Sequence, residues 1–218
     1  MSPEKILDSD HDAKLREMGN YLWDLEQKAD IASARGELTQ VVELEQKILR
    51  QAERAKAFLQ VGGQHQLLAA FVAGLGFRML RRWQDATDLF LVVLQLSPMN
   101  GEAWLELSWC LAELNRWDDC EIAARKSVEI FPDNAAPWGN LALALNKLGK
   151  TREAIAAINR ATELDPADPR NKMIRDLITL AWKSHEPERS RDFQMLFSGR
   201  SSQENKFLID SNTRFFSD

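Results

Sequence analysis

The chain contains three consecutive segments of equal length: LLAAFVAGLGFRMLRRWQDATDLFLVVLQLSPMN (67–100), GEAWLELSWCLAELNRWDDCEIAARKSVEIFPDN (101–134) and AAPWGNLALALNKLGKTREAIAAINRATELDPAD (135–168). Proline occupies the same position near the end of each segment, as Pro98, Pro132 and Pro166. Trp104 of the second segment is matched by Trp138 of the third. Apolar residues also recur at helical spacing within each segment. A period this strict predicts an array of stacked helix pairs, in which each pair buries its apolar stripe against its neighbours.

Local signals inside the three segments agree with that prediction. Small residues recur where two helices must approach closely, at Gly74, Ser108 and Ala142 and again at Ala86, Cys120 and Ala154. A polar break separates the two apolar halves of each segment: Arg81-Arg82, Asn115-Arg116 and Gly149-Lys150. Short polar residues precede each new helix, where their side chains can accept hydrogen bonds from free backbone N–H groups: Asn100, Asn134 and Asp168.

This pattern resembles the tetratricopeptide repeat family. In the segment 101–134 the first-helix positions of the family motif are occupied by Trp104, Leu107, Ser108 and Leu111, and the second-helix positions by Cys120, Ala124, Ser127 and Pro132. The segment 135–168 matches through Trp138, Leu141, Ala142, Leu145, Ala154, Ile158, Ala161 and Pro166. The segment 67–100 keeps Ala73, Gly74, Phe77, Ala86, Phe90 and Pro98 but has Ala70 where tryptophan is usual. The resemblance implies an all-α, right-handed solenoid of antiparallel helix pairs, a fold that hosts many functions.

Composition points to an ordinary acidic protein. The chain has 218 residues and a formal net charge of -5. An acidic balance argues against a general nucleic-acid binder, which usually carries a basic face. The first 14 residues lack the apolar core of a signal peptide, and no stretch approaches the length of a membrane span. Cys110 and Cys120 are expected to be free thiols. We therefore expect a cytoplasmic protein with no membrane insertion.

Flanking segments extend the three repeats on the N-terminal side. We expect a flexible leader at residues 1–10 and a helical hairpin at residues 11–61, broken at Gly36. The segment Gly36–Leu49 is similar to the second half of a tetratricopeptide unit. The hairpin is therefore interpreted as a degenerate repeat or an N-terminal cap. The alternative is a coiled-coil arm that forms dimers, although Glu45 interrupts its apolar seam.

On the C-terminal side, residues 169–184 are expected to form a capping helix, with Ile174, Leu177, Ile178 and Ala181 facing the last repeat. Residues 185–218 form a polar tail with apolar clusters. These clusters either pack on the repeats or form a docking motif for a partner or for another copy. The candidate docking residues are Phe193, Leu196, Phe197, Phe207, Phe215 and Phe216.

The sequence contains no persuasive catalytic or metal-binding motif. His11, His65 and His185 lie in separate segments, without cysteine or carboxylate spacing that is typical of a metal site. The Gly74-Leu-Gly76 sequence lacks the third glycine of a dinucleotide fingerprint and lies within an expected repeat helix. We therefore expect no cofactor, no metal and no enzymatic activity.

The family resemblance implies that the first helix of each unit lines a concave groove. Carried over position by position, the candidate groove is apolar at one end, acidic in the middle and richer in amides with one lysine at the other end. Exposed apolar patches usually mark interaction sites, and tryptophan is frequent among binding hot spots. The alternative is that the N-terminal hairpin or the tail covers the apolar part. The candidate partner-binding residues are Leu68, Phe71, Val72, Leu75, Glu102, Leu105, Glu106, Trp109, Asn140, Leu143 and Lys147.

The carboxylate clamp of the family, which binds the acidic C-termini of Hsp70 and Hsp90, is not expected here. Phe71 and Leu75 occupy positions where that clamp needs lysine and asparagine. Glu102, Glu106 and Glu113 would repel a carboxylate. The expected ligand is instead a segment with apolar anchors and some positive charge.

Three functions follow as hypotheses. The first is a non-enzymatic adaptor or scaffold that binds a protein partner. The second is a chaperone for a secreted or assembly-prone client, because the organisation also looks like that of class II chaperones of type III secretion. The third is a self-assembling structural subunit. Co-expression with an insoluble client tests the second hypothesis, and light scattering tests the third.

Overall fold

The computed structural model describes residues 3–60 and 65–185, and in these ranges every regular element is helical. The chain divides into two compact units, Met1–Leu114 and Asn115–Asp218. The first unit holds α1 (Pro3–Ala34), α2 (Leu38–Ala57), a short 3₁₀ turn η1 (Phe58–Gln60), α3 (His65–Met79), α4 (Trp83–Leu96) and α5 (Gly101–Glu113). The second unit holds α6 (Trp117–Ile130), α7 (Ala135–Lys147), α8 (Thr151–Leu164) and α9 (Pro169–His185).

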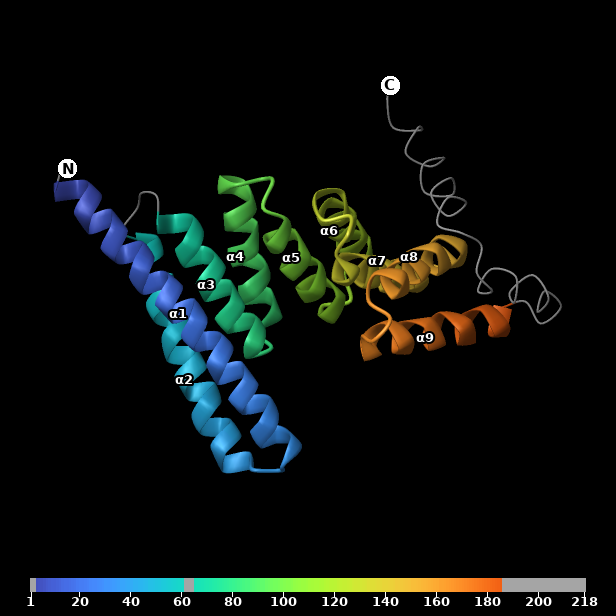
Figure 1. Cartoon of the computed structure of the whole chain (residues 1–218), viewed down its shortest axis with the longest axis horizontal. Coiled ribbons are helices and arrows are strands. Elements are labelled where there is room, and N and C mark those ends of the chain that lie inside the picture. Colours follow the sequence, from blue (N-terminus) through green and yellow to red (C-terminus); the bar gives the residue numbers. More distant parts are fainter. Residues whose placement is uncertain (1–2, 61–64, 186–218) are drawn as a thin grey trace, which may run out of the picture. The chain divides into compact units, whose positions relative to one another are not determined.

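Antiparallel helix pairs build the first unit. Helices α1 and α2 lie side by side, and both pack against α3, which pairs in turn with α4 (Figure 1). Helix α1 begins at Pro3, so it includes residues that we expected to form a flexible leader. Proline suits the first turn of a helix because its missing N–H has no intrahelical partner there.

One turn geometry closes the helix pairs along the chain. The second residue after the first helix has a positive φ at Arg81 (57°), Asn115 (57°) and Gly149 (75°), which are spaced by the repeat period. At Gly149 the turn is held by hydrogen bonds from the N–H of Gly149 to the carbonyl of Asn146 and from the N–H of Lys150 to that of Leu145. This pattern satisfies carbonyls that the helix end would leave free.

The turn of the N-terminal hairpin has the same form. Gly36 has a φ of 74°, and its N–H donates to the carbonyl of Ser33 while the N–H of Glu37 donates to that of Ala32. This local likeness to the repeat turns supports the interpretation of α1 and α2 as a degenerate repeat. After α2, however, the chain forms the 3₁₀ turn η1 instead of the proline turn.

The recurring tryptophan and proline are physically linked. The indole N–H of Trp104 donates to the carbonyl of Pro98 at 2.8 Å, and that of Trp138 donates to the carbonyl of Pro132 at 2.9 Å. Each tryptophan therefore fastens the turn between two repeats to the helix that follows. Asn100 and Asn134 cap the same helices, as expected, by accepting from the N–H groups of residues 103 and 136.

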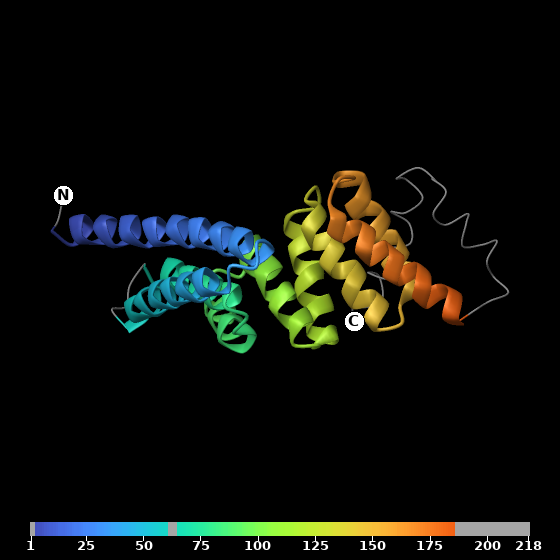
Figure 2. The same cartoon turned by 90° about the horizontal axis from the view of Figure 1, so that it is seen from below.

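In the second unit, α7 packs against α6, α8 and α9, and α8 also contacts α9 (Figure 2). The core of this unit includes Trp138, Leu141, Leu145, Ile158 and Ile178, all of them buried. Ile174 and Ile178 join α9 to this core, as expected. Leu177 was expected on the same buried stripe but is 42% exposed. Its side chain points away from the core, beside the face that Ile174 and Ile178 bury.

Candidate functional site

A buried arginine on α3 is the centre of a charged contact between three helices of the first unit. The Arg78 side chain is buried, and its Nη2 lies 3.1 Å from Oε1 of Glu26 on α1. Its Nε lies 2.9 Å from Oε2 of Glu106 on α5, an ion pair without good hydrogen-bond geometry. We call Glu26, Arg78, Glu106 and Trp109 the Arg78 cluster. Three helices therefore contribute charged groups to one place.

Trp109 completes the cluster through its aromatic face. The guanidinium carbon of Arg78 lies 5.3 Å from the centre of the Trp109 ring, within the range of a cation–π interaction. Trp109 is half-buried. The arginine thus contacts an aromatic side chain that stays partly exposed.

The cluster carries an excess of negative charge when its carboxylates are ionised. Burial raises the pKa of Glu106 above its ordinary value; the positive charge of Arg78 opposes this, while Glu26 and Glu102 add to it. Arg78 therefore pairs with two carboxylates, those of Glu26 and Glu106. A third carboxylate, Glu102, is exposed one helical turn away on α5. Such a site favours a cationic group on a partner and disfavours an anionic one.

Of the apolar candidates on α3, Val72 is buried and the others are partly exposed. Val72 is only 3% exposed, and a Cβ placed on Gly19 of α1 would lie 3.6 Å from its Cγ2. The ring of Phe71 packs edge-on against Phe90 of α4 with centroids 5.8 Å apart. Val72 therefore forms part of the contact between α1 and α3. The remaining apolar candidates of this unit are half-buried: Leu68, Phe71, Leu75 and Leu105.

The candidates in the second unit all lie on α7. Asn140 and Leu143 are half-buried, whereas Lys147 is exposed. The ammonium of Lys147 lies 5.5 Å from the centre of the Trp117 ring on α6. Lys147 thus contacts an aromatic face in its own unit. The candidate docking residues of the tail, from Phe193 to Phe216, lie outside the described residues.

Two histidines that are distant in the sequence come together where α1 meets α3. His65 is buried, its Nδ1 lies 2.7 Å from Oδ1 of Asp12, and the rings of His65 and His11 are 5.2 Å apart. The His11 ring also contacts Phe58 edge-on. Within residues 3–60 and 65–185, no cluster of three or more His, Cys, Asp or Glu side chains is arranged to hold a metal ion.

Sequence reasoning missed Glu26. Its position beside the apolar stripe of α1 marks it as close to the packed face, but nothing in the sequence pairs it with Arg78, 52 residues away. Arg78 itself falls on a groove position of the repeat pattern. Its burial depends on α1, whose packing on α3 the repeat period does not predict.

Comparison of the sequence with models of known protein families identifies the same repeats as the helix pairs and their turns. Tetratricopeptide repeat models match residues 71–135 and residues 135–168. The chain contains tetratricopeptide repeats. Its fold is the all-α arrangement of helix pairs that the period predicted, and the family is one of protein-interaction modules. No curated protein sequence matches the chain significantly.

Solved structures of other tetratricopeptide proteins are similar in fold. The Arabidopsis OM64 domain is 18% identical with a TM-score of 0.52, and the match covers 57% of this chain and 100% of that one. The first such domain of Spaghetti (RPAP3), bound to the HSP90 peptide SRMEEVD, is 17% identical with a TM-score of 0.52, covering 55% and 95%. A MamA variant is 19% identical with a TM-score of 0.50, covering 70% and 97%.

None of the helices in the described parts of the chain is both long and apolar enough to cross a bilayer.

Proposed function

We propose that this protein is a non-enzymatic adaptor, and that its Arg78 cluster binds a segment of a protein partner that carries an apolar anchor and a positive charge. The observation that carries the proposal is the contact of Arg78 with Trp109 and with two carboxylates from two other helices. Trp109 offers an aromatic surface for the anchor. Glu102 and Glu106 offer negative charge for a lysine or arginine beside it.

The charges on α5 support this class of ligand over an acidic C-terminus. Among the structural neighbours, RPAP3 was solved with the acidic peptide SRMEEVD. In the present chain Phe71 and Leu75 replace the lysine and asparagine that the carboxylate clamp requires, and Glu106 already competes for the positive charge of Arg78. An acidic peptide would face at least as many carboxylates as cations at this site.

The test combines an unbiased selection with a defined probe. Random peptides would be displayed and selected on the full chain, and the peptide SRMEEVD would be titrated separately. We expect the selected peptides to be enriched in lysine or arginine beside aromatic or aliphatic residues, and SRMEEVD not to bind. Substituting Trp109→Ala should weaken the selected peptides by roughly thirtyfold, which is the scale of a binding hot spot.

Two further variants test whether the charge beside the cluster affects peptide binding. Glu102→Lys reverses an exposed charge next to the cluster and should weaken the selected peptides, with a loss that shrinks at high salt. Glu43→Lys makes the same change on α2 and should have no effect. Measurable binding of SRMEEVD to the wild-type chain, or selected peptides rich in acidic residues, would contradict the proposal. Loss of helical circular dichroism in Trp109→Ala would instead make Trp109 a core residue.

A chaperone would present a similar surface to its client. It would differ from an adaptor in keeping an otherwise insoluble partner in solution during co-expression. An adaptor's partner should be soluble when it is expressed alone.

A further inference from the structure

The last described helix presents a row of apolar side chains to solvent. Met173, Leu177 and Leu180 on α9 are 58%, 42% and 68% exposed, although Ile174 and Ile178 on the adjoining side are buried. The spacing of four and three residues places the exposed side chains on one side of the helix. We call these three residues the outer row of α9. A helix that ended the repeats against water alone would be expected to carry polar residues there.

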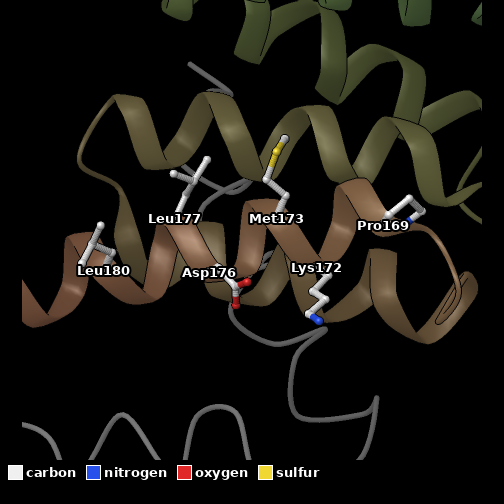
Figure 3. A pocket seen from close by; sticks show the side chains of 6 residues that line it. All are labelled: Pro169, Lys172, Met173, Asp176, Leu177 and Leu180. Atoms are coloured by element: carbon white, nitrogen blue, oxygen red, sulfur yellow. The ribbon is translucent and has the colours of Figure 1, made fainter. Parts of the chain in front are cut away.

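The outer row borders an open pocket of about 350 Å³, lined among the described residues by Pro169, Lys172, Met173, Asp176, Leu177 and Leu180. Figure 3 shows Met173 and Leu177 pointing toward one edge of this face of α9, while Lys172 and Asp176 point toward its other edge. The surface therefore has an apolar strip with a charged edge. This arrangement is typical of a helix face that another segment covers.

We propose that the outer row of α9 is a docking surface for the chain's own segment Phe193–Phe197. This segment contains Phe193, Met195, Leu196 and Phe197, four apolar residues among five. Helix α9 ends at His185, so Phe193 follows it by eight residues. Eight extended residues span up to about 26–29 Å, whereas α9 from Met173, the far end of the outer row, to its own end spans only about 18 Å. The segment therefore reaches any part of the outer row.

Covalent connection favours this occupant over a second copy of the chain. A segment joined by a short linker acts at an effective concentration on the order of millimolar. A second molecule would have to reach that concentration in solution to compete. The apolar composition of the segment matches the outer row, which offers side chains of the same kind.

Methionine oxidation tests the proposal in the full chain. Met173 and Met99 are both exposed in the described structure, at 58% and 76%, so hydrogen peroxide should oxidise them at similar rates if nothing covers α9. With the segment docked, Met173 should be oxidised at least about fivefold more slowly than Met99, as expected for a group shielded from solvent. Peptide mass spectrometry measures both rates in one sample.

Substitutions in the segment provide the matched comparison. Phe193→Lys/Phe197→Lys leaves α9 unchanged and should raise the oxidation rate of Met173 to that of Met99, whose own rate should stay constant. Phe207→Lys/Phe215→Lys makes the same change later in the tail and should leave Met173 protected. Equal oxidation of Met173 and Met99 in the wild-type chain would overturn the proposal. So would protection that persists in Phe193→Lys/Phe197→Lys.

Dilution and addition of other proteins test the two alternative occupants of the outer row, a second copy of the chain and a different protein. Protection of Met173 that weakens on dilution, together with a dimer in light scattering, would assign the outer row to a second copy and refute docking within one chain. Full exposure of Met173 that is lost only when another protein is added would assign it to a partner. The measurement does not involve Trp109 or Glu102, so its failure leaves the proposed function untouched.

Discussion

Glu121 shows how single charged residues stabilise the second unit. One carboxylate oxygen lies 2.8 Å from Nη2 of Arg125, and the other lies 2.8 Å from Nζ of Lys150 at the turn before α8. Arg125 also pairs with Glu153 of α8 at 2.7 Å. Burial alone would raise the pKa of Glu121, but the hydrogen bonds from Lys150 and Arg125 bring it below its ordinary value. The carboxylate therefore connects α6 to α8 in its charged form.

Neutralising this carboxylate should destabilise the protein at neutral pH. Glu121→Gln is expected to lower the free energy of unfolding by about 1–2 kcal/mol at pH 7, because it weakens two charge-assisted hydrogen bonds at a largely buried site. A lowered folded-state pKa gives stability that is present above the ordinary pKa of 4.5 and is lost as the pH falls through the lower folded value. The difference between variant and wild type should therefore shrink below pH 4.5.

Urea titrations at pH 7 and pH 3 measure this difference. Glu129→Gln on the same helix is the control, because Glu129 pairs with Lys126 but is 63% exposed at its side chain, and exposed pairs contribute about 0–1 kcal/mol. An equal loss in the two variants, or a loss that is independent of pH, would show that Glu121 does not act through its charge.

At the scale of elements, glycine sets how closely α3 approaches α2. A Cβ added at Gly76 would lie 2.7 Å from Cβ of Ala52 and 3.3 Å from its Cα. Gly76→Ala should therefore destabilise the protein by roughly 1–2 kcal/mol, since overpacking exceeds the gain in helix propensity. Ala52→Gly should restore most of this loss in the double variant. At Gly19 an added Cβ has only an ordinary contact, so Gly19→Ala should stabilise by about 0.5–1 kcal/mol.

A double-mutant cycle by thermal and denaturant unfolding tests the contact. If Ala52→Gly and Gly76→Ala were additive, the two residues would not face each other across α2 and α3. Additivity would then argue against the packing of the N-terminal hairpin on the first repeat.

The helix pairs themselves could be predicted because their signals are local. The interval between Pro98, Pro132 and Pro166 marks the turns, and Asn100 and Asn134 cap the helices that follow. Exposure at the edges of helices could not be predicted in the same way. Leu177 lies between the buried and exposed sides of α9, and helical periodicity alone does not decide whether such a residue has a neighbour.

The candidate site was only partly predictable, because it depends on contacts between elements that are far apart in the sequence. Repeat positions identified Glu106 and Trp109 on α5. They did not show that α1 would bring Glu26 to Arg78 or cover Val72. Packing of the N-terminal hairpin on α3 depends on the shapes of both surfaces, and these shapes produce no periodic pattern in the sequence.

At the scale of the whole molecule, the division at Leu114 and Asn115 predicts how a local loss of stability spreads. In proteins built of stacked repeats, each repeat contacts mainly its neighbours, so stability is approximately a sum of local terms. Gly76→Ala should therefore raise amide hydrogen exchange in α2 and α3 by roughly tenfold, while exchange in α8 and α9 changes by less than about twofold. Glu121→Gln should show the reverse pattern, with its effect in α6 and α8. Peptide-resolved hydrogen exchange at pH 7 measures both variants, and an equal rise in both units for either variant would mean that the chain unfolds as one cooperative unit.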